Sequence, residues 1–411
     1  MSRIVVLGGC GGIGTIATRT VAVGEDFDQI VVADLRAEEA AALAATIDHR
    51  GISSAAFDAT DPASIRAVMD GADQVLNCVG PFYRFGAPIL QVAISAGVDY
   101  VDVCDDLDAT LAQLDLDDAA SDAGVCALVG MGNSPGLANV LARYAADHLL
   151  DVVDRVDISH IHGGEPAEGG AVIKHRIHAM TNDIPVFVDG EQRSVRMLED
   201  SGREFIVDTD FRDVGTFPVY PYPHPETITL PRHLKGLKRC TNSGVVFPLS
   251  YFNLTMDMVR VGACTTEALT VDGAQVVPIE FSVAHILSQR ERLLAEAGVT
   301  GPAGCLKIVV GGSKDGAPHT FVFSLSSTSE GAGEGTGIPA GLGAVLMHRG
   351  SIASPGVHPP ESIVDPIEMM ALAGEVIGKL GVTSAGEGGG VPIHIEHIKP
   401  DGSSEELPLE L

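Results

Sequence analysis

The chain has 411 residues, of which 45% are hydrophobic and 20% are charged. This length exceeds what one hydrophobic core usually holds, so we expect two domains. The formal net charge is −29, and the 26 Lys and Arg residues are spread along the whole length. Nucleic acids are bound by clustered basic side chains, so this composition argues against a nucleic-acid-binding protein and indicates an acidic, solvated surface.

The seven cysteines are widely separated, and no two have the two-residue spacing of a structural zinc site. Their odd number gives no disulfide framework, which predicts a reducing compartment. The N-terminus enters a strand without a basic segment followed by an apolar one, and there is no run of about 18 apolar residues. We therefore expect a cytoplasmic protein without a metal site, a membrane segment or a nucleic-acid partner.

The first 130 residues alternate short apolar runs with helical segments. The predicted strands are 4–7, 29–33, 54–57, 74–78, 100–103 and 126–129, and the helices are 15–23, 37–49, 62–69, 88–96 and 107–123. Nearly continuous apolar strands are typical of a parallel sheet that helices cover on both faces. The pattern predicts an α/β fold whose residues 1–135 form a Rossmann-type, doubly wound, dinucleotide-binding domain.

A glycine-rich segment joins the first predicted strand to the first helix. Gly9, Gly11 and Gly14 satisfy Gly-x-Gly-x-x-Gly, and Asp34 ends the next strand twenty residues after Gly14. In this context the pattern is the dinucleotide fingerprint, because the glycines permit a tight turn, close approach of the pyrophosphate and close packing of helix on strand. The N–H groups at the helix N-terminus then bind the diphosphate.

Asp34 also indicates which dinucleotide binds. A carboxylate at this position accepts hydrogen bonds from the ribose hydroxyls and repels a 2′-phosphate, which favours NAD. Arg36 would pair with that phosphate, so NADP is the alternative. The predicted cofactor-binding residues lie at the ends of the strands: Gly9, Cys10, Gly11, Gly12, Ile13, Gly14, Asp34, Leu35, Arg36, Asp58, Ala59, Cys78, Val79, Gly80, Pro81, Cys104 and Asn133.

Four further segments resemble the saccharopine dehydrogenase superfamily. They are Asn-Cys-Val-Gly-Pro-Phe at 77–82, Ala-Gly-Val-Asp-Tyr-Val-Asp at 96–102, a Gly-x-x-Pro-Gly-x-x-Asn turn within 130–139, and Gly-Ser-Ile with Gly-Val-His-Pro-Pro-Glu at 350–361. The segments 217–226, 234–239 and 311–316 are similar to carboxynorspermidine dehydrogenases within it. The resemblance implies an NAD(P)-dependent oxidoreductase of amino-acid or polyamine metabolism that acts on a carbon–nitrogen bond, commonly as a dimer.

The resemblance also implies a second domain that carries the substrate pocket. Strand-like runs occur at 155–161, 205–207, 268–271, 307–310 and 320–325. They predict an α+β substrate or dimerisation domain over 136–345 with an open, largely antiparallel sheet. Residues 346–411 are expected to return to the first domain through a helix at 366–380 and a strand at 392–398. The glycine-rich segment 329–343 is either a surface loop or a mobile lid, and the acidic tail after 401 is a frayed end.

Hydride transfer requires a proton donor or acceptor and groups that match the charge of the substrate. Asp105 follows the fifth predicted strand, on the side where parallel sheets bind ligands, and is a candidate for a carboxylate beside an iminium. Capping the next helix is its alternative role. His178 and His224 are the candidates for proton transfer, with a structural role as the alternative for His224.

Candidate substrate-binding residues come from both halves of the chain. Lys174 and His178 are four residues apart, and together with Arg176 they concentrate basic side chains in a very acidic protein. We expect them to bind an anionic group of the substrate, with an exposed basic stripe as the alternative. Tyr222 lies in a stiff, proline-rich segment that is typical of a pocket wall, and Tyr100 lies in the family-like strand.

These features predict hydride transfer to or from a carbon–nitrogen bond, by imine reduction or by oxidation of an amine or amino acid. The expected partners are a small-molecule substrate and a second copy of the chain. Two alternatives stay open. One is an NAD-dependent dehydrogenase of a hydroxylated substrate, and the other is a dinucleotide-binding protein without catalytic activity.

Overall fold

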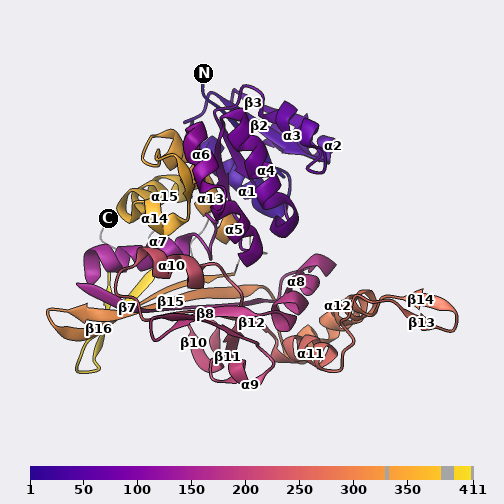
Figure 1. Cartoon of the computed structure of the whole chain (residues 1–411), viewed down its shortest axis with the longest axis vertical. Helices are drawn as coiled ribbons and strands as arrows, with labels where there is room; N and C mark the ends of the chain where they lie inside the picture. The colour runs from indigo at the N-terminus through magenta and orange to yellow at the C-terminus, as the bar shows by residue number, and fades with distance from the viewer. Residues whose placement is uncertain (329–332, 381–392, 409–411) are drawn as a thin grey trace.

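The computed structural model of the protein describes residues 1–328, 333–380 and 393–408. Over these residues the chain forms two domains, which Figure 1 shows one above the other. The upper domain is built on a seven-stranded sheet and the lower domain on a ten-stranded sheet. The predicted α/β architecture, with a Rossmann-type sheet and a second, largely antiparallel sheet, is confirmed.

All strand pairs of the first sheet are parallel, in the order β17-β6-β5-β4-β1-β2-β3. Along β1, Ile4 and Val6 face one apolar core while Val5 and Leu7 face another, as the two-residue period of a strand requires. Apolar runs predict six of these strands, but the three residues of β17 are too few to give a pattern. The strands are β1 (Arg3–Leu7), β2 (Gln29–Asp34), β3 (Ile52–Ala56), β4 (Gln74–Asn77), β5 (Asp99–Asp102), β6 (Cys126–Leu128) and β17 (Gly356–His358).

Helices cover both faces of this sheet. The helix predicted over 107–123 is divided into α5 and α6. Two of the covering helices, α13 and α15, come from the far end of the chain and contact α1. The helices are α1 (Gly12–Val23), α2 (Ala37–Thr46), α3 (Pro62–Met69), α4 (Phe82–Ala96), α5 (Leu107–Leu114), α6 (Asp117–Ala123), α13 (Gly333–His348) and α15 (Pro366–Leu380).

Helix α13 occupies most of the segment for which the sequence predicts a loop or a lid. Three of its glycines, Gly333, Gly337 and Gly341, recur every four residues and so lie on one face of the helix. A Cβ atom on Gly337 would stand 2.8 Å from the backbone oxygen of Ile13, and one on Gly341 would stand 2.4 Å from Cγ2 of Thr20. These glycines therefore serve close contact with α1, and the loop or lid is wrong for 333–343. Residues 329–332 lie outside the described part.

The second sheet follows the path β10-β11-β12-β7-β15-β16-β18-β19, with β8 beside β12 and β9 beside β8. The pair β12 and β7 is parallel, and the other pairs within the described residues are antiparallel. The strands are β7 (Val152–Gly163), β8 (Ile184–Val188), β9 (Glu191–Val195), β10 (Val207–Phe211), β11 (Gly215–Pro221), β12 (Arg239–Phe247), β15 (Ala303–Lys314), β16 (Ala317–Ser327), β18 (His394–Ile398) and β19 (Ser404–Leu407).

Helix α7 lies between the domains, because it contacts β15 on one side and α14 and α15 on the other. A short hairpin, β13 (Leu269–Val271) and β14 (Ala274–Val276), projects from the second domain (Figure 1). In the part of the chain that the structure describes, no helix is both long and apolar enough to span a membrane. The other helices are α7 (Leu137–Tyr144), a π-helical turn (Ala145–Leu149), α8 (Gly170–Thr181), α9 (Asp200–Arg203), α10 (Glu226–His233), α11 (Leu249–Arg260), α12 (Pro278–Glu296) and α14 (Pro360–Ile363).

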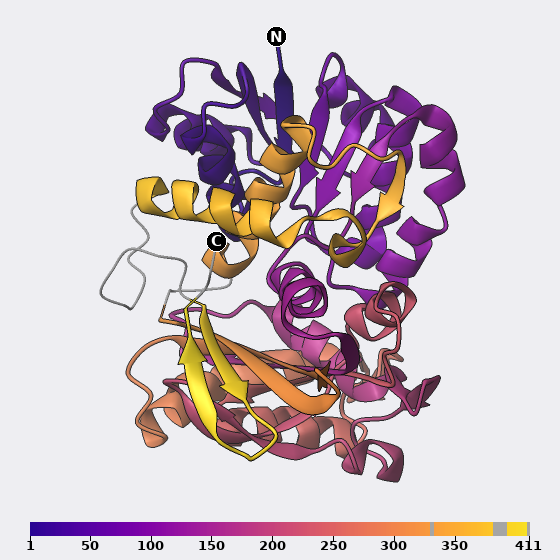
Figure 2. The ribbon, with the colours of Figure 1, turned by 90° about the vertical axis from the view of Figure 1, so that its left-hand side faces the viewer.

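The last part of the chain divides between the two domains (Figure 2). Strand β17 pairs with β6 of the first sheet, and helix α15 contacts α1. Strands β18 and β19 instead extend the second sheet beside β16. Ile395 is buried in the core of the second domain, which explains why β18 pairs there. The structure thus differs from the predicted boundary, and Ser404–Leu407 form a paired strand and not a frayed end.

Candidate active site between the two domains

The glycine-rich loop connects β1 to α1 at the carboxyl edge of the first sheet. A Cβ atom on Gly14 would stand 2.1 Å from the backbone oxygen of Gly8, and one on Gly9 would stand 2.8 Å from a methyl carbon of Val32. Neither position accepts a side chain. A Cβ atom on Gly12 would have no neighbour within 4 Å, so this part of the loop leaves space for a ligand.

Helix α1 begins at this loop with its N-terminus free for an anion. Its N-cap residue is Gly11, and no side chain caps the helix. The first N–H groups of a helix have no partner within the helix, and they carry a partial positive charge. The loop therefore fits the diphosphate of a dinucleotide, as the sequence predicts.

Asp34 ends β2, and its side chain is nearly buried. Its Oδ1 accepts hydrogen bonds from the backbone N–H of Arg36 at 3.1 Å and from the Nε of Arg36 at 3.3 Å. Burial alone would raise the pKa of Asp34, but the hydrogen bonds from Arg36 and from the thiol of Cys10 lower it. The Nη1 of Arg36 also lies 2.7 Å from Oε2 of Glu39. The guanidinium is thus shared between two carboxylates.

The other predicted cofactor residues of this edge follow β2, β3, β4 and β6. Leu35 is exposed, and Asp58 accepts hydrogen bonds from Thr60. The segment 78–81 contains a cis peptide bond between Gly80 and Pro81. A Cβ atom on Gly80 would have no neighbour within 4 Å, so the chain there is open to a ligand. Ala59 follows β3, Val79 follows β4 and Asn133 follows β6.

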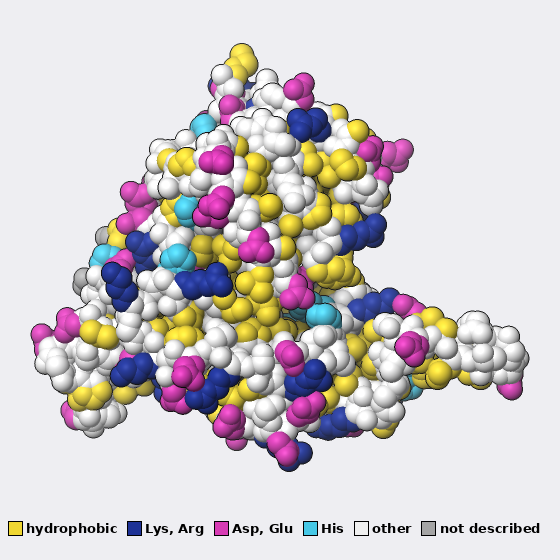
Figure 3. Space-filling model, viewed as in Figure 1, with side chains coloured by type: hydrophobic (Ala, Val, Ile, Leu, Met, Phe, Trp, Pro, Cys, Tyr) yellow, Lys and Arg dark blue, Asp and Glu magenta, His cyan; other side chains and the backbone are white. Residues whose placement is uncertain are grey.

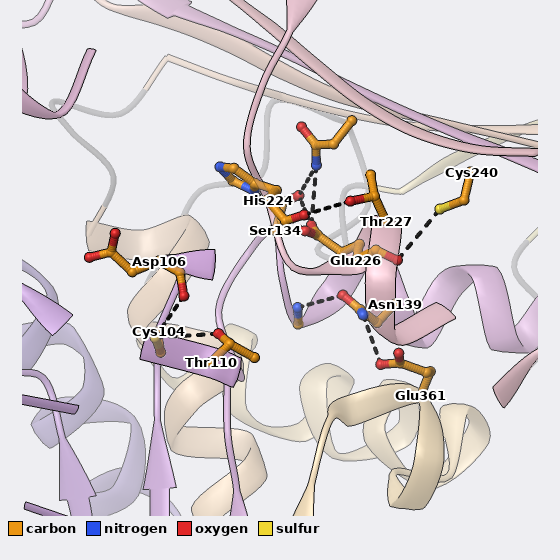
Figure 4. Close-up of polar contacts among 12 residues, drawn as sticks. Cys104, Asp106, Thr110, Ser134, Asn139, His224, Glu226, Thr227, Cys240 and Glu361 are labelled. Carbon is orange, nitrogen blue, oxygen red and sulfur yellow. Dashed lines mark hydrogen bonds and ion pairs between the residues drawn. The ribbon is translucent and has the colours of Figure 1, made fainter. Parts of the chain in front are cut away.

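Two residues that the sequence assigns to ligands belong to the core. Tyr100 is fully buried, and its hydroxyl donates to Oδ2 of Asp102 at 2.8 Å. Cys104 is also fully buried, with its Sγ 3.5 Å from the hydroxyl of Thr110 (Figure 4). The predictions that Tyr100 binds substrate and that Cys104 binds cofactor are therefore corrected. Their position at a strand end suits a ligand contact, but their side chains fill the layer beneath α5.

The second domain faces these strand ends across a hollow that Figure 3 shows between the two domains. Burial raises the pKa of Asp106, and the charge of Asp105 raises it further, whereas His175 and His178 lower it. The charges of Asp105 and Asp106 also raise the pKa of His224. The structure therefore brings Asp105 and Asp106 near His224, whereas His178 is exposed and its Nδ1 lies 3.0 Å from the amide nitrogen of Asn182. The catalytic roles of Asp105, His178 and His224 stay predictions. No group of three or more Cys, His, Asp and Glu side chains among the described residues is arranged to bind a metal.

Aromatic and imidazole rings form one wall of this site. The ring of Tyr222 lies 5.5 Å from that of His224, 5.3 Å from that of His160 and 6.0 Å from that of His175, between centroids. Burial raises the pKa of Tyr222, so its hydroxyl keeps its proton. Tyr222 thus lies among imidazole rings, and its role in binding substrate stays a prediction.

A buried carboxylate stands behind His224 (Figure 4). The Nδ1 of His224 lies 3.5 Å from Oε2 of Glu226, which is fully buried. The other oxygen of Glu226 accepts hydrogen bonds from the hydroxyl of Ser134 and the amide of Asn242. Burial alone would lower the pKa of His224, but the charge of Glu226 and then of Asp105 and Asp106 raises it. Sequence reasoning missed Glu226, although it stands two residues after His224.

A second buried carboxylate joins the C-terminal segment to α7. The amide of Asn139 donates to Oε2 of Glu361 at 2.8 Å, and its oxygen accepts from the N–H of Gly136 at 2.9 Å. Burial raises the pKa of Glu361 to about 7. Its position in the Pro-Pro-Glu motif was the available signal for this contact, which fixes α14 against the turn after β6.

The basic residues of α8 have partners within the protein. The Nζ of Lys174 lies 2.6 Å from Oε1 of Glu280, and both side chains are exposed. Arg176 is buried and pairs with Glu168 at 2.5 Å, while Glu168 also accepts a hydrogen bond from the hydroxyl of Tyr251 at 2.6 Å. The structure thus differs from the prediction that these two side chains bind an anionic group. Glu280 is 106 residues from Lys174 and Glu168 is 8 residues from Arg176, so neither pair has the three- or four-residue spacing of an ion pair within a helix.

Comparisons with known proteins agree with this architecture. Residues 4–128 match the family described as saccharopine dehydrogenase NADP binding domain. The chain is 26% identical over 396 residues to carboxyaminopropylagmatine dehydrogenase of Synechocystis sp., covering 92% of this chain and 96% of that protein. It is 28% identical over 323 residues to carboxynorspermidine synthase of Vibrio cholerae, covering 71% and 73%.

A solved structure shows the same fold. Apo saccharopine dehydrogenase (L-Glu forming) from Saccharomyces cerevisiae superposes with a TM-score of 0.66 at 16% identity, covering 91% of this chain and 97% of that one. The similarity therefore extends over both domains. Together with the sequence matches, it confirms the resemblance predicted from the motifs.

Proposed function

We propose that the protein is an NAD(P)-dependent oxidoreductase that acts on the carbon–nitrogen bond of a carboxylated polyamine. Its residues 4–128 match the saccharopine dehydrogenase NADP binding domain. Two relatives that align with most of this chain are named for such compounds. The observation that carries the proposal is the pair of buried His224 and fully buried Glu226, next to Asp105 and Asp106, which follow strand β5. A net charge of −29 favours the approach of a cationic amine.

The proposed mechanism divides the work between the domains. The loop from Gly9 to Gly14 would hold the diphosphate of the dinucleotide and Asp34 its ribose, and the bound cofactor supplies hydride chemistry at carbon. His224 accepts a proton from the amine nitrogen during oxidation, or donates one during imine reduction. Asp105 contributes negative charge that favours the cationic nitrogen, and Tyr222 limits access of water from its side of the cleft.

We propose NAD as the preferred dinucleotide. The carboxylate of Asp34 is ionised and nearly buried, so a 2′-phosphate placed beside it would be repelled. Arg36, which would attract such a phosphate, is held by Asp34 and Glu39. NADP is the alternative, because the family is described by NADP binding.

The direct test is turnover of the purified enzyme with carboxynorspermidine or carboxyaminopropylagmatine and either NAD⁺ or NADP⁺, followed by the absorbance of the reduced dinucleotide. We expect activity in the wild type, and a decrease of kcat by about 10²–10⁴-fold in His224→Gln, which loses proton transfer. His162→Gln is the matched control, since His162 is exposed and pairs with Glu165. Turnover of a hydroxylated substrate without any amine oxidation would contradict the proposal, as would dinucleotide binding without turnover of either class.

We propose also that the enzyme is a homodimer of the cytoplasm. The projecting hairpin exposes Leu269 and Val271, which are 57% and 51% accessible. An isolated two-stranded hairpin is marginally stable in water, so a second copy covering it would stabilise it. The seven cysteines are unpaired, as expected in a reducing compartment. Light scattering should give the mass of a dimer, and Leu269→Asp should shift it towards the monomer; a monomeric wild type would contradict this.

A further inference from the structure

Glu226 occupies an unusual position for a carboxylate. It is fully buried at the start of α10, and among the ion pairs of the described residues it takes part in one, with His224. An unpaired, ionised carboxylate in such a place would cost several kcal/mol. The nearby imidazole of His224 is therefore the group that compensates the buried carboxylate.

The two oxygens of Glu226 contact different domains (Figure 4). Oε1 accepts the hydroxyl of Ser134, which belongs to the turn after β6 in the dinucleotide-binding domain. Oε1 also lies 3.3 Å from the amide nitrogen of Asn242 on β12 in the second domain. Oε2 faces Nδ1 of His224 at 3.5 Å, an ion-pair distance, and neither of these two buried atoms makes a hydrogen bond among the described residues. One carboxylate thus links the imidazole to the domain that carries the glycine-rich loop.

We propose that Glu226 is the positioning residue that orients His224 for proton transfer and holds it in register with the Ser134 turn of the dinucleotide-binding domain. This inference rests on the proposed function of His224. When the imidazole is neutral, Glu226 accepts the Nδ1–H, which leaves Nε2 as the proton acceptor on the side of the cleft. When Nε2 takes the proton of an amine, the charge of Glu226 balances the imidazolium.

Other charged groups also face His224, and they set the baseline for a titration. Asp105 and Asp106 approach from the end of β5, and both raise the pKa of His224. His160 on β7 stacks on its ring at 5.4 Å, and burial lowers the pKa of His160. Tyr222 keeps its proton. Removing the charge of Glu226 should therefore lower the pKa of His224 without abolishing the effect of the two aspartates.

The experiment is a titration of His224 in the whole protein by NMR of labelled histidine rings, with the signal assigned by its loss in His224→Gln. In Glu226→Gln we expect the pKa of His224 to fall by about one unit or more, since one unit corresponds to ~1.4 kcal/mol of lost charge interaction. Glu226→Asp, which keeps the charge, should restore part of the wild-type value. Ser134→Ala should leave the pKa nearly unchanged and should lower kcat.

The pH profile of amine oxidation is the second measurement. The acidic limb of kcat/KM reports the His224 base, so it should move to lower pH in Glu226→Gln while the affinity for the dinucleotide stays the same. A His224 pKa that is equal in the wild type and Glu226→Gln would overturn the inference, and so would an unchanged kcat in both Glu226→Gln and Ser134→Ala. If the wild type oxidises no amine, the proposed function fails, but the NMR titration still decides the role of Glu226.

Discussion

The two domains build their binding groups in opposite ways. In the first domain, the six consecutive residues from Gly9 to Gly14 and the end of the next strand form the predicted dinucleotide site, mostly from backbone atoms. Where the two domains meet, the site is made of side chains that come from distant parts of the chain. Ser134 and Glu226 are 92 residues apart, and Asn139 and Glu361 are 222 residues apart. A site made of backbone depends on local sequence, whereas a site made of side chains depends on the complete fold.

The sharpest test of this contrast is removal of the buried charge pair on α8. Arg176→Ala removes the nearest partner of the buried Glu168, which keeps Arg290 at 3.5 Å and the hydroxyl of Tyr251, and should reduce the free energy of unfolding by about 3 kcal/mol in urea denaturation. Lys174→Ala is the matched control on the same helix, because its pair with Glu280 is exposed and contributes at most about 1 kcal/mol. Equal stability of Arg176→Ala and the wild type, with weaker substrate binding, would instead support an anionic subsite on α8.

The same contrast explains what the sequence could and could not predict. The spacing of apolar residues predicts six strands of the first sheet, and the Gly-x-Gly-x-x-Gly fingerprint predicts the loop at Gly9 to Gly14 and the role of Asp34. Each of these sequence patterns lies within about thirty residues. The partner of Lys174, Glu280, is 106 residues away and is brought close only by tertiary packing. Glu168 lies in the loop before α8, 8 residues from Arg176, where no helical spacing predicts the pair. Likewise, the many glycines of 329–343 predict a surface loop or a mobile lid, whereas Gly337 and Gly341 serve close contact with α1.

Substitutions at Gly14 and Gly12 distinguish residues of the loop that are needed for packing from residues that are needed for dinucleotide binding. In Gly14→Ala the new Cβ atom would stand 2.1 Å from a backbone oxygen, so we expect a loss of about 1–3 kcal/mol in stability together with weaker dinucleotide binding. Gly12→Ala meets nothing within 4 Å, so it should weaken binding and leave unfolding unchanged. Thermal unfolding with and without NADH measures both. Equal stability in the two variants would contradict the packing argument.

Glu361 provides a pH-dependent test in the contact between the domains. Burial raises its pKa from 4.5 to about 7, so the folded state holds this proton more tightly than the unfolded state. Its contribution to stability is complete below the unfolded pKa and is lost as the pH rises towards 7, with a slope of at most about 1.4 kcal/mol per pH unit. Glu361→Gln should remove this slope in urea denaturation at pH 5–8, whereas Glu368→Gln, at an exposed position, should not.

The smallest expected effect concerns the choice of dinucleotide. Asp34→Asn removes the charge that repels a 2′-phosphate, and we expect the ratio of NADPH to NADH affinity to rise about tenfold, equivalent to ~1.4 kcal/mol. Glu39→Gln removes one ion pair of Arg36 and should raise the ratio of NADPH to NADH affinity by less than tenfold. Fluorescence titration with both reduced dinucleotides gives these ratios. An unchanged ratio in Asp34→Asn would show that selectivity resides elsewhere in the loop.

The packing of α13 on α1 also determines the order in which a ribosome can complete the molecule. Residues 1–128 leave the exit tunnel first, but the helix that covers α1 follows the strands of the second domain up to β16. The nascent dinucleotide-binding domain therefore stays incompletely packed, with part of its apolar surface exposed, until translation has passed residue 348. Chaperones protect such incompletely folded intermediates from aggregation. A contiguous N-terminal fragment is consequently a poor substitute for the whole enzyme in expression or engineering.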